Sequence, residues 1–366
     1  MKLNLSRELL LGPLQSVVGV VERRQTMPIL ANVMFSVKEG RLSVTATDLE
    51  VELLAHTPVP ESSEGEITLP ARKLLDIIRS LPDESNVAIE VVDGKAQISS
   101  GRSRFALATL PATEFPAVES GNALVSFTIS QRDLRHLLEQ THFAMAQQDV
   151  RYYLNGLLLE FREDILRGVA TDGHRLSLCD VPAAIGAAEM NQVIVPRKGV
   201  MELQRLLEDT DAQVKVEVSN NHVRISFDEL RFTSKLVDGR FPDYERVIPK
   251  GGQNVMQVGR KDLRQSLGRA AILSNEKYRG VRLTLSAGKL SLQAQNPEQE
   301  SAEEDVEVSY DGDEIEIGFN VGYLLDPLAA LDSDEIEMTL IDGNSSCVIS
   351  SPGETLNAHI VMPMRL

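Results

Sequence analysis

The chain of 366 residues contains no tryptophan, and aromatic residues make up only 4% of it. So few aromatic side chains argue against a stacking platform for single-stranded nucleic acid. The only two cysteines, Cys179 and Cys347, lie far apart in apolar, strand-like segments, which predicts reduced, buried thiols rather than a disulfide framework. The six histidines show no His-x-x-His or Cys-x-x-Cys spacing, so a metal site has little support. No apolar run approaches membrane-spanning length, and the N-terminal segment lacks a signal-type apolar core, so we expect a cytoplasmic protein.

Positive charge is also scarce in this sequence. With 37 Lys and Arg against 54 Asp and Glu, the net charge is −17, which taken over the whole chain argues against a nucleic-acid-binding protein. Hydrophobic residues make up 42% and charged residues 25%, so the chain can bury a sizeable core. Its length predicts two or three domains rather than one.

Three blocks of sequence recur in the same order, which indicates an internal repeat. The first block is a short alternating strand that runs into an amphipathic helix, with a leucine at a matched position. It begins at Leu3, Phe127 and Met256, and the matched leucines are Leu9, Leu134 and Leu263. The second block, again a strand running into a helix, has its junctions at Pro70, Pro196 and Asn320. The third block begins at Arg104, Arg231 and Thr355. We therefore predict three copies of one domain, at 1–122, 123–250 and 251–366.

Each copy is expected to be an α+β unit with two helices and many antiparallel strands. Between the helices, Val, Ile and Leu alternate with polar residues and are punctuated by Asp-Gly or Asn-Gly pairs, which suit tight hairpin turns. These pairs begin at Asp93, Asn155, Asp172, Asp238, Asp311 and Asp342. Pro13 falls inside the first helix and is expected to kink or shorten it. The helices of a copy should gather on one face of its sheets.

Basic residues recur on five of the six predicted helices or next to them, although the chain as a whole is acidic. They are Arg7, Arg23, Arg24, Arg72, Lys73, Arg79, Arg132, Arg135, His136, Arg197, Lys198, Arg205, Arg260, Lys261, Arg264 and Arg269. For a single helix, an ordinary solvated face explains such charges. Their recurrence on one sheet face instead favours a shared surface that attracts phosphates without reading base sequence.

Acidic residues concentrate in one block between Glu298 and Glu316, which holds ten acids and no base. On a strand edge this block would repel a second copy of itself and would suit the basic segment from Gly101 to Phe105. Such a contact between the first and third copies is head to tail, and head-to-tail contacts close rings or make filaments. A solubilising acidic loop is the alternative.

Helix dimensions limit the size of such a ring. Because a helix is about 10 Å across, six helices in a circle leave a hole of roughly 10 Å, whereas twelve leave roughly 28 Å. Duplex DNA is roughly 20 Å wide, so only the larger hole admits it. Three repeats with two helices each would therefore need two chains.

The sequence closely resembles one family over its whole length, the β subunit, or sliding clamp, of bacterial DNA polymerase III. The motifs that carry the resemblance begin at Thr47 (TDLE), Leu69 (LPARK), Gly101 (GRSRFALATLP), Gln148 (QDVRYYLNG), Val169 (VATDGHRL), Val195 (VPRKG), Phe232 (FTSKLVDGRFPDY), Arg269 (RAAILSNEKYRGVRL), Asn296 (NPEQE) and Val361 (VMPMRL).

The resemblance implies a head-to-tail homodimeric ring, with helices inside and sheets outside, that encircles duplex DNA at a primed template and gives processivity without chemistry. It implies no cofactor. The implied partners bind through one peptide pocket and are the polymerase III α subunit, the clamp loader δ subunit, other DNA polymerases, a mismatch-repair protein and ligase.

The resemblance also implies three sets of site residues. The peptide pocket would be Leu154, Thr171, Gly173, His174, Arg175, Leu176, Pro242, Arg246, Val247, Tyr278, Asn320, Tyr323, Ser346, Ile360, Val361, Met362, Pro363, Met364, Arg365 and Leu366. DNA contacts would come from Arg24, Arg72, Gln148, Tyr152, Tyr153, Arg197 and Lys198. The dimer seam would join Lys73, Arg102, Arg104, Phe105 and Leu107 to Ile272, Leu273, Glu298, Glu300, Glu303 and Glu304. Asn344 stands where the family has a small apolar residue.

Two other interpretations of the sequence compete with this one. An enzyme would have to use Asp172, His174 and Arg175 as an acid–base cluster. However, the Asp-Gly pair there is an ordinary turn signal, and neither a nucleophile nor a phosphate-binding glycine loop accompanies it. A repeat-built scaffold that binds proteins but never DNA is the third interpretation, and it predicts no salt-sensitive association with circular duplex.

Overall fold

The computed structural model describes residues 1–21, 27–59, 62–116, 118, 121–186, 192–354 and 356–365. By its contacts the chain divides into two compact units. The first contains Met1–Arg132 and Lys198–Leu236, and the second contains Asp133–Ala187, Asn191–Arg197 and Val237–Leu366. Within the described ranges, no helix combines the length and apolar character needed to cross a membrane.

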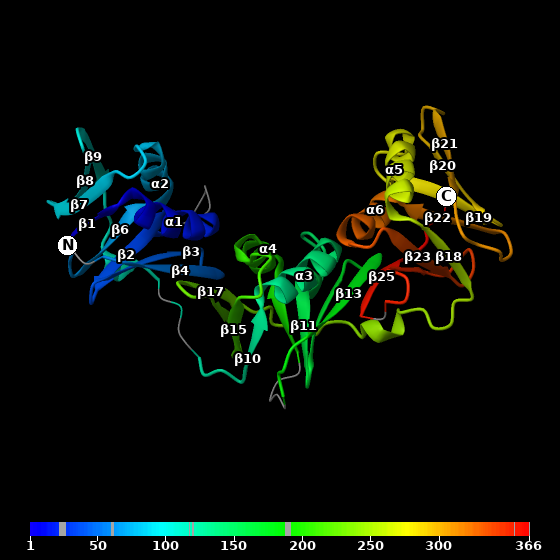
Figure 1. Ribbon diagram of the computed structural model, residues 1–366, viewed down its shortest axis with the longest axis horizontal. Helices are drawn as coiled ribbons and strands as arrows, with labels where there is room; N and C mark the ends of the chain where they lie inside the picture. Colours follow the sequence, from blue (N-terminus) through cyan, green and yellow to red (C-terminus); the bar gives the residue numbers. More distant parts are fainter. Residues whose placement is uncertain are drawn as a thin grey trace. The chain divides into compact units, whose positions relative to one another are not determined.

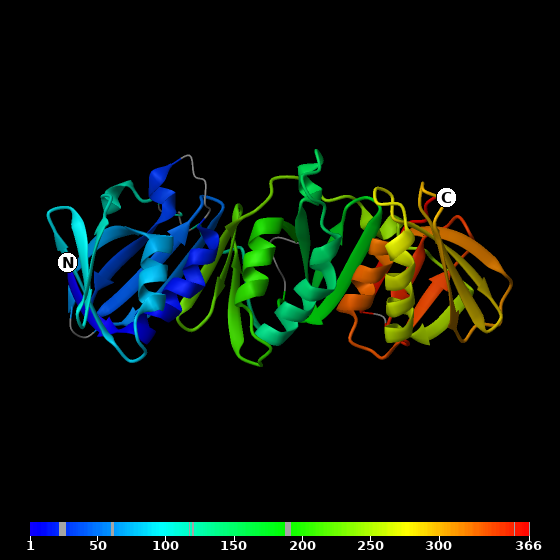
Figure 2. The same cartoon turned by 90° about the horizontal axis from the view of Figure 1, so that it is seen from above.

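Six α-helices lie in the described residues, two in each predicted repeat (Figure 1). They are α1 (Arg7–Val17), α2 (Ala71–Ser80), α3 (Gln131–Thr141), α4 (Arg197–Leu206), α5 (Arg260–Ala270) and α6 (Val321–Ala330). Each follows directly on a β-strand, as the recurring strand-to-helix pattern predicts. Seen from above in Figure 2, α1 and α2 run side by side, and so do α5 and α6.

Twenty-five strands form four antiparallel sheets in the described part of the chain. The first sheet has the order β5 (Ser62–Ser63), β1 (Lys2–Ser6), β7 (Asn86–Val92), β8 (Lys95–Ser100) and β9 (Ser103–Ala108). The second has the order β10 (Val125–Ser130), β15 (Gln213–Val218), β16 (His222–Ser226), β17 (Leu230–Lys235), β4 (Val51–Pro58), β3 (Arg41–Thr47), β2 (Asn32–Lys38) and β6 (Gly65–Pro70).

The other two sheets belong to the second and third repeats. The third sheet has the order β14 (Gln192–Pro196), β11 (Gly156–Arg162), β12 (Ile165–Thr171), β13 (Arg175–Pro182), β25 (Asn357–Val361), β24 (Cys347–Ser350), β23 (Glu335–Leu340) and β18 (Asn254–Gly259). The fourth has the order β21 (Ser301–Glu307), β20 (Lys289–Gln295), β19 (Gly280–Ser286) and β22 (Ile315–Asn320).

Successive repeats are joined by strand pairing. The second sheet crosses from the first repeat to the second where β4 pairs with β17, with Leu53 opposite Phe232. The third sheet crosses from the second repeat to the third where β13 pairs with β25, with Leu176 opposite Ile360. By contrast, β9 and β21 each end their sheet, so each presents one edge without a strand partner in the described structure.

The core of the third repeat shows how the helices are held. Leu263 and Leu267 of α5 and Leu324 and Leu328 of α6 are fully buried in one cluster with strand residues such as Phe319. This is the apolar stripe that an amphipathic helix presents to a sheet.

Both cysteines are free and buried, as predicted. Burial raises the thiol pKa of Cys347 to about 12, and it also raises that of Cys179, so neither thiol is reactive at neutral pH.

Two predictions about α1 need correction. The leucine of α1 that matches Leu134 and Leu263 is Leu10, which is fully buried, and not Leu9, which is 41% exposed. Pro13 does not shorten α1, which has 11 residues like α3 and α5. The Leu9 carbonyl, which loses its intrahelical donor to Pro13, lies on the exposed side, where water can bond it.

The Asp-Gly and Asn-Gly pairs do not all make hairpin turns. Asp93 and Gly94 do, with φ of 50° and 71° between β7 and β8. Asn155-Gly156 instead starts β11, where a Cβ on Gly156 would lie 2.7 Å from the Val195 carbonyl oxygen. This glycine serves close strand packing rather than a turn.

Two of the helix cations bond inside the protein rather than facing outward. The first residue of α1, Arg7, donates from Nε to the Ile78 carbonyl of α2 at 3.0 Å. The first residue of α5, Arg260, donates from Nη1 to the Leu328 carbonyl of α6 at 3.1 Å. Both bonds bring a charged donor to a carbonyl in the last turn of a helix, so these arginines stabilise helix pairs.

Candidate functional site

The turn between β12 and β13, which belongs to the predicted peptide pocket, is held by several local hydrogen bonds. The Asp172 carboxylate accepts the backbone N–H groups of His174 and Arg175 at 2.9 and 3.0 Å. The Thr171 hydroxyl donates to the Arg175 carbonyl at 2.6 Å, and Gly173 has φ of +89°. These contacts assign Asp172 a turn-forming role, so the geometry gives no support to its use as a catalytic acid or base.

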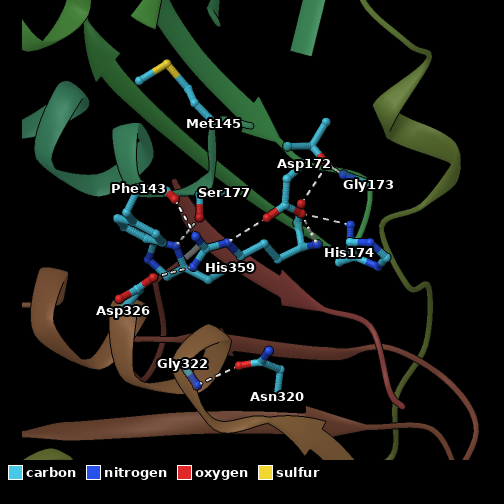
Figure 3. A network of polar contacts seen from close by, with 12 residues as sticks. Phe143, Met145, Asp172, Gly173, His174, Ser177, Asn320, Gly322, Asp326 and His359 are labelled. Atoms are coloured by element: carbon cyan, nitrogen blue, oxygen red, sulfur yellow. Dashed lines mark hydrogen bonds and ion pairs between the residues drawn. The ribbon is translucent and has the colours of Figure 1, made fainter. Parts of the chain in front are cut away.

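Arg175 connects this turn to two other segments, and its side chain is only 12% exposed. Its guanidinium bonds the carboxylate of Asp172 at 3.2 Å, the carboxylate of Asp326 in α6, and the Phe143 carbonyl at 2.5 Å (Figure 3). It also lies over the Tyr323 ring, 4.6 Å from the ring centroid. With its donors engaged in this way, Arg175 anchors the site and shapes its wall. Sequence reasoning missed Asp326 and Phe143, because nothing in their local sequence indicates these long-range contacts.

The C-terminal segment is fixed to the turn and to β22 by its backbone. The N–H of Met362 donates to the His174 carbonyl at 2.9 Å, and that of Met364 to the Gly318 carbonyl at 2.8 Å. The His174 ring stacks on Tyr323 with centroids 6.3 Å apart. These contacts bring the turn, α6 and the tail together, as the pocket prediction requires.

Asn320 connects the start of α6 to the segment that precedes β19. Its side-chain oxygen accepts the Gly322 N–H at 2.9 Å, which caps α6 (Figure 3). Its amide nitrogen donates to the Tyr278 carbonyl at 3.3 Å. The Tyr278 ring is exposed beside this bond.

The remaining pocket residues divide into a buried floor and an exposed rim. Leu154, in the 3₁₀ turn η5 (Tyr152–Leu154), is buried, as are Leu176, Ile360 and Val361. The exposed members include Pro242, Arg246, Val247, Met362 and Arg365, whereas Pro363, Met364 and Ser346 are half-buried. Asn344 is exposed in the loop between β23 and β24, where its N–H donates to Asp342. Leu366 lies outside the described residues.

The rim segment that carries Pro242, Arg246 and Val247 is held by its own neighbours. Phe241 and Tyr244 are buried in the cluster that contains Leu176 and Ile360. The short helix η6 (Tyr244–Arg246) is therefore tied to the floor through shared packing, which leaves Val247 exposed at its end.

A cavity of about 700 Å³ continues from Tyr278, Met364 and Arg365 onto the fourth sheet. It is lined there by polar side chains of β19, β20 and β21, which are Arg282, Gln293, Gln295, Ser301 and Glu303. Sequence reasoning missed this extension, which only the sheet register brings together.

The predicted DNA-contact residues are exposed to different extents. Tyr152 is 57% exposed, while its neighbour Tyr153 is half-buried and packs against the Leu176 cluster. Arg72 and Gln148 are exposed, and the Arg72 guanidinium donates to the Val21 carbonyl at 2.5 Å. Arg24 lies outside the described residues.

Two of these cations are engaged inside the protein. The Lys198 ammonium pairs with the buried carboxylate of Asp48. Arg197 is half-buried and donates to the Met145 carbonyl at 3.3 Å, and burial lowers the pKa of its guanidinium. These two side chains are oriented by the protein before any phosphate arrives.

Of the predicted seam residues of the first repeat, Arg102 precedes β9, Arg104, Phe105 and Leu107 lie in it, and Lys73 lies in α2. Lys73, Arg102 and Arg104 are exposed, and the Arg104 guanidinium donates to the Gly101 and Ser103 carbonyls at 2.8 and 2.7 Å. Phe105 is half-buried and Leu107 is buried.

Those of the third repeat lie on or near β21. Ile272 is 76% exposed in the turn η7 (Ala271–Leu273), and Leu273 is half-buried. Glu298, Glu300 and Glu303 are exposed. Glu304 differs, because its carboxylate takes two bonds from the Arg269 guanidinium, at 2.8 and 2.6 Å, which lowers its pKa.

His359 is a buried ionisable group beside the pocket. It is fully buried in β25, where its ring bonds the Ser177 hydroxyl at 3.1 Å, and Nε2 has no partner among the described atoms. Burial lowers its pKa to about 3, so the imidazole is neutral at physiological pH. Among the described residues, no group of three His, Cys, Asp or Glu side chains is placed to hold a metal ion.

Family models of the DNA polymerase III beta subunit match the chain three times in succession. The N-terminal domain matches residues 1–119, the central domain 128–243 and the C-terminal domain 245–365. With the six helices and antiparallel sheets, these matches confirm the predicted fold class of three tandem α+β copies.

Known proteins resemble the chain over its full length. It is 53% identical to the beta sliding clamp of Pseudomonas putida and 49% identical to that of Escherichia coli K12, with all of each chain covered. A crystal structure of the DNA polymerase III subunit beta from Pseudomonas aeruginosa superposes with a TM-score of 0.98 at 52% identity, again over 100% of both chains. The pol III beta structure of Caulobacter crescentus gives 0.94 at 39% identity, also over all of both chains.

The buried His359 makes the stability of this region depend on pH. A histidine in an unfolded chain has a pKa of about 6.5. Below that pH, position 359 therefore binds a proton in the unfolded chain, whereas the buried imidazole of the folded protein stays neutral. Stability therefore falls as the pH falls, by about 1.4 kcal/mol per unit below about pH 6.5, or about 2 kcal/mol at pH 5. Urea unfolding of the wild type and of His359→Gln at several pH values measures this contribution. We expect a shallower pH dependence in the variant, and parallel curves for the two proteins would contradict the assignment.

Proposed function

Because the chain belongs to the DNA polymerase III β subunit family, the β sliding clamps, we propose that two copies join head to tail in a ring around duplex DNA. The membership confirms the predicted sliding-clamp function. Sliding clamps are processivity factors and not enzymes, so the protein acts by binding, and the acid–base interpretation of Asp172, His174 and Arg175 is rejected. The repeat boundaries 1–122, 123–250 and 251–366 stay part of the proposal.

One observation carries the proposal, namely the repeated mode of joining between repeats. The strands β4, β13 and β21 occupy equivalent positions in the three repeats. Each is the last strand of a three-stranded antiparallel meander, which is β2-β3-β4 in the first repeat, β11-β12-β13 in the second and β19-β20-β21 in the third. The strands β9, β17 and β25 are likewise the last strands of their repeats. Inside the chain, β4 pairs with β17 and β13 with β25, which leaves β21 and β9 as the two unused members of the series. If β21 of each chain pairs with β9 of a second copy, every strand of the two series has a partner and the ring is closed at both seams.

The side chains near these two edges favour unlike over like pairing. Arg102 and Arg104 lie at the β9 edge, and Glu300 and Glu303 lie at the β21 edge. Two β21 edges would repel each other, whereas β21 and β9 attract. The dimer thus needs no symmetric patch, only two complementary ends on each chain.

The apolar residue Ile272 supports the same seam. Its 3₁₀ turn, η7, follows α5 as η4 (His142–Ala144) follows α3, so Ile272 is equivalent to Phe143. Phe143 lies at an internal junction, with its ring 5.6 Å from that of His359 on the neighbouring repeat. Ile272 is 76% exposed in the single chain and would be covered by the partner.

DNA would pass through the ring without a sequence-specific grip. The contacts we propose are Arg24, Arg72, Gln148, Tyr152, Tyr153, Arg197 and Lys198. Lys198 and Arg197 are already bonded within the protein, which favours loose phosphate attraction over tight binding. Such contacts permit sliding, and closure of the ring would provide retention.

The peptide pocket would tether partners to this ring. Its anchored turn, its buried apolar floor and the exposed Val247 and Met362 suit a short apolar peptide segment, and methionine adapts to several partners. We propose that the polymerase III α subunit, the clamp loader δ subunit, other DNA polymerases, a mismatch-repair protein and ligase use it in the cytoplasm.

The seam is tested by removing its apolar contact. Ile272→Ala with Leu273→Ala should raise the dimer Kd at least 100-fold, because each ring contains the contact twice and burial of each side chain is worth about 1.5–3 kcal/mol. Sedimentation velocity over a concentration series measures this. Ile341→Ala, which trims an exposed apolar side chain away from β21, should leave the dimer intact. An unchanged dimer in the double variant would refute the seam.

The pocket is tested by removing the tail. Deletion of Met362–Leu366 should weaken binding of a fluorescent peptide from the polymerase clamp-binding segment at least 100-fold while the dimer persists. Because the tail also bonds His174 and Gly318, the single change Met362→Ala is measured beside it, with an expected loss of about tenfold. Met201→Ala, an exposed methionine on α4, should bind the peptide normally. Retained affinity in both tail variants would remove the pocket assignment.

A further inference from the structure

Both junctions inside the chain contain a hydrogen bond from the second repeat to the C-terminal end of a helix in a neighbouring repeat, the first repeat at one junction and the third at the other. At the first junction, Nη2 of Arg205 in α4 donates to the Ser16 carbonyl of α1 at 2.7 Å. At the second, the side-chain amide of Gln140 in α3 donates to the Ala330 carbonyl of α6 at 2.6 Å. Each bond satisfies a carbonyl of the last helical turn, which has no intrahelical donor.

The equivalent helix in the third repeat is α5, and its tenth residue is Arg269. The helices α3 and α5 have 11 residues each, and their buried leucines Leu134 and Leu263 occupy the same stripe. Gln140 is the tenth residue of α3, so Arg269 is its counterpart by position in the helix. The counterpart of α6 is α2, since each has 10 residues, and Ser80 ends α2 as Ala330 ends α6.

The C-terminal ends of α2 and α6 carry the same cap from within their own repeats. Arg7 donates to Ile78 of α2, and Arg260 donates to Leu328 of α6, at matched positions. In α6 the terminal carbonyl also has its bond from the neighbouring repeat, from Gln140. The Ser80 carbonyl of α2 accepts no hydrogen bond from the described residues, so α2 lacks only the contact that a neighbouring repeat would supply.

The Arg269 side chain is oriented to donate a hydrogen bond to the C-terminal end of an α2 helix. Its Nε and Nη2 atoms bond the two oxygens of Glu304 on β21, and Nη2 also bonds the Ser266 hydroxyl at 2.9 Å. A bidentate pair of this kind fixes the plane of the guanidinium. In the described chain, Nη1 makes no hydrogen bond, so its N–H groups point away from the pair as available donors. The side chain is 53% exposed next to the β21 edge.

We propose that Arg269 of one subunit caps helix α2 of its partner by donating from Nη1 to the Ser80 carbonyl. Glu304 is then a positioning residue, which acts by orienting Arg269 within its own chain. The inference rests on the proposed head-to-tail dimer and specifies which contact closes its seam between helices. The partner is a second copy of this chain, and the contact completes the set of caps already present at the two internal junctions.

Substitutions at position 269 distinguish a hydrogen bond to the helix carbonyl from a purely electrostatic effect of the positive charge. Arg269→Ala should raise the dimer Kd on the order of 100-fold, because each ring holds the contact twice and a charged hydrogen bond is worth about a factor of ten or more. Arg269→Gln places the donor of Gln140 at the same helix position, so it should stay within about tenfold of the wild type. Glu304→Gln keeps the Arg269 guanidinium but weakens the contact that orients it, so its dimer Kd should lie between those of Arg269→Gln and Arg269→Ala. Arg264→Ala, an equal loss of charge on the exposed side of α5, should leave the Kd unchanged.

Subunit exchange between fluorescently labelled proteins, measured without DNA at low and high salt, reads out these values. The ratio between Arg269→Ala and wild type should persist at high salt, because a short bond to a carbonyl is screened little. The proposal is overturned if Arg269→Gln is as weak as Arg269→Ala, if the ratio collapses to one at high salt, or if Arg269→Ala dimerises like the wild type. A monomeric wild type would instead refute the dimer itself.

Discussion

The edge of a β-sheet carries backbone N–H and C=O groups that must find partners, and this constraint governs how the repeats associate. The chain satisfies it twice internally, by pairing β4 with β17 and β13 with β25. The remaining edges, β9 and β21, are exposed and bear opposite charges. A protein with two such ends must either cover them or aggregate, and closure with a second copy covers both.

The helix ends follow the same logic on a smaller scale. C-terminal carbonyls of three helices, α1, α2 and α6, receive side-chain donors, which come from Arg205, Arg7, Gln140 and Arg260. Arg7, Arg205 and Arg260, which the sequence pattern assigns to a phosphate-attracting surface, therefore bond helix ends inside the protein. What remains for DNA is a modest set of exposed or pre-oriented charges, which suits a protein retained by enclosure. The peptide pocket is built separately, around the fully engaged Arg175, so that partner binding need not disturb the seam.

The repeat and the positions of all six helices could be predicted from sequence, because strand-to-helix junctions recur with the same apolar pattern. The register of α1 could not, since Leu9, Leu10 and Leu11 are consecutive and any of them could face the core. Contacts between distant segments were also beyond reach. Nothing near Arg269 in the sequence points to Glu304, and nothing near Arg175 points to Asp326 or to the Phe143 carbonyl. The resemblance supplied the pocket and seam residues, whereas only the structure separates the buried floor from the exposed rim.

Retention by enclosure can be tested directly by changing the topology of the DNA while its sequence and length stay the same. The protein is loaded by a clamp loader with ATP onto a nicked circular plasmid, and the bound fraction is isolated by gel filtration before and after a single restriction cut. Our account predicts stable retention on the circle and release by sliding off the ends once the DNA is linear. Equal retention on circular and linear DNA would contradict it, because a protein that grips the duplex has no need of a closed path.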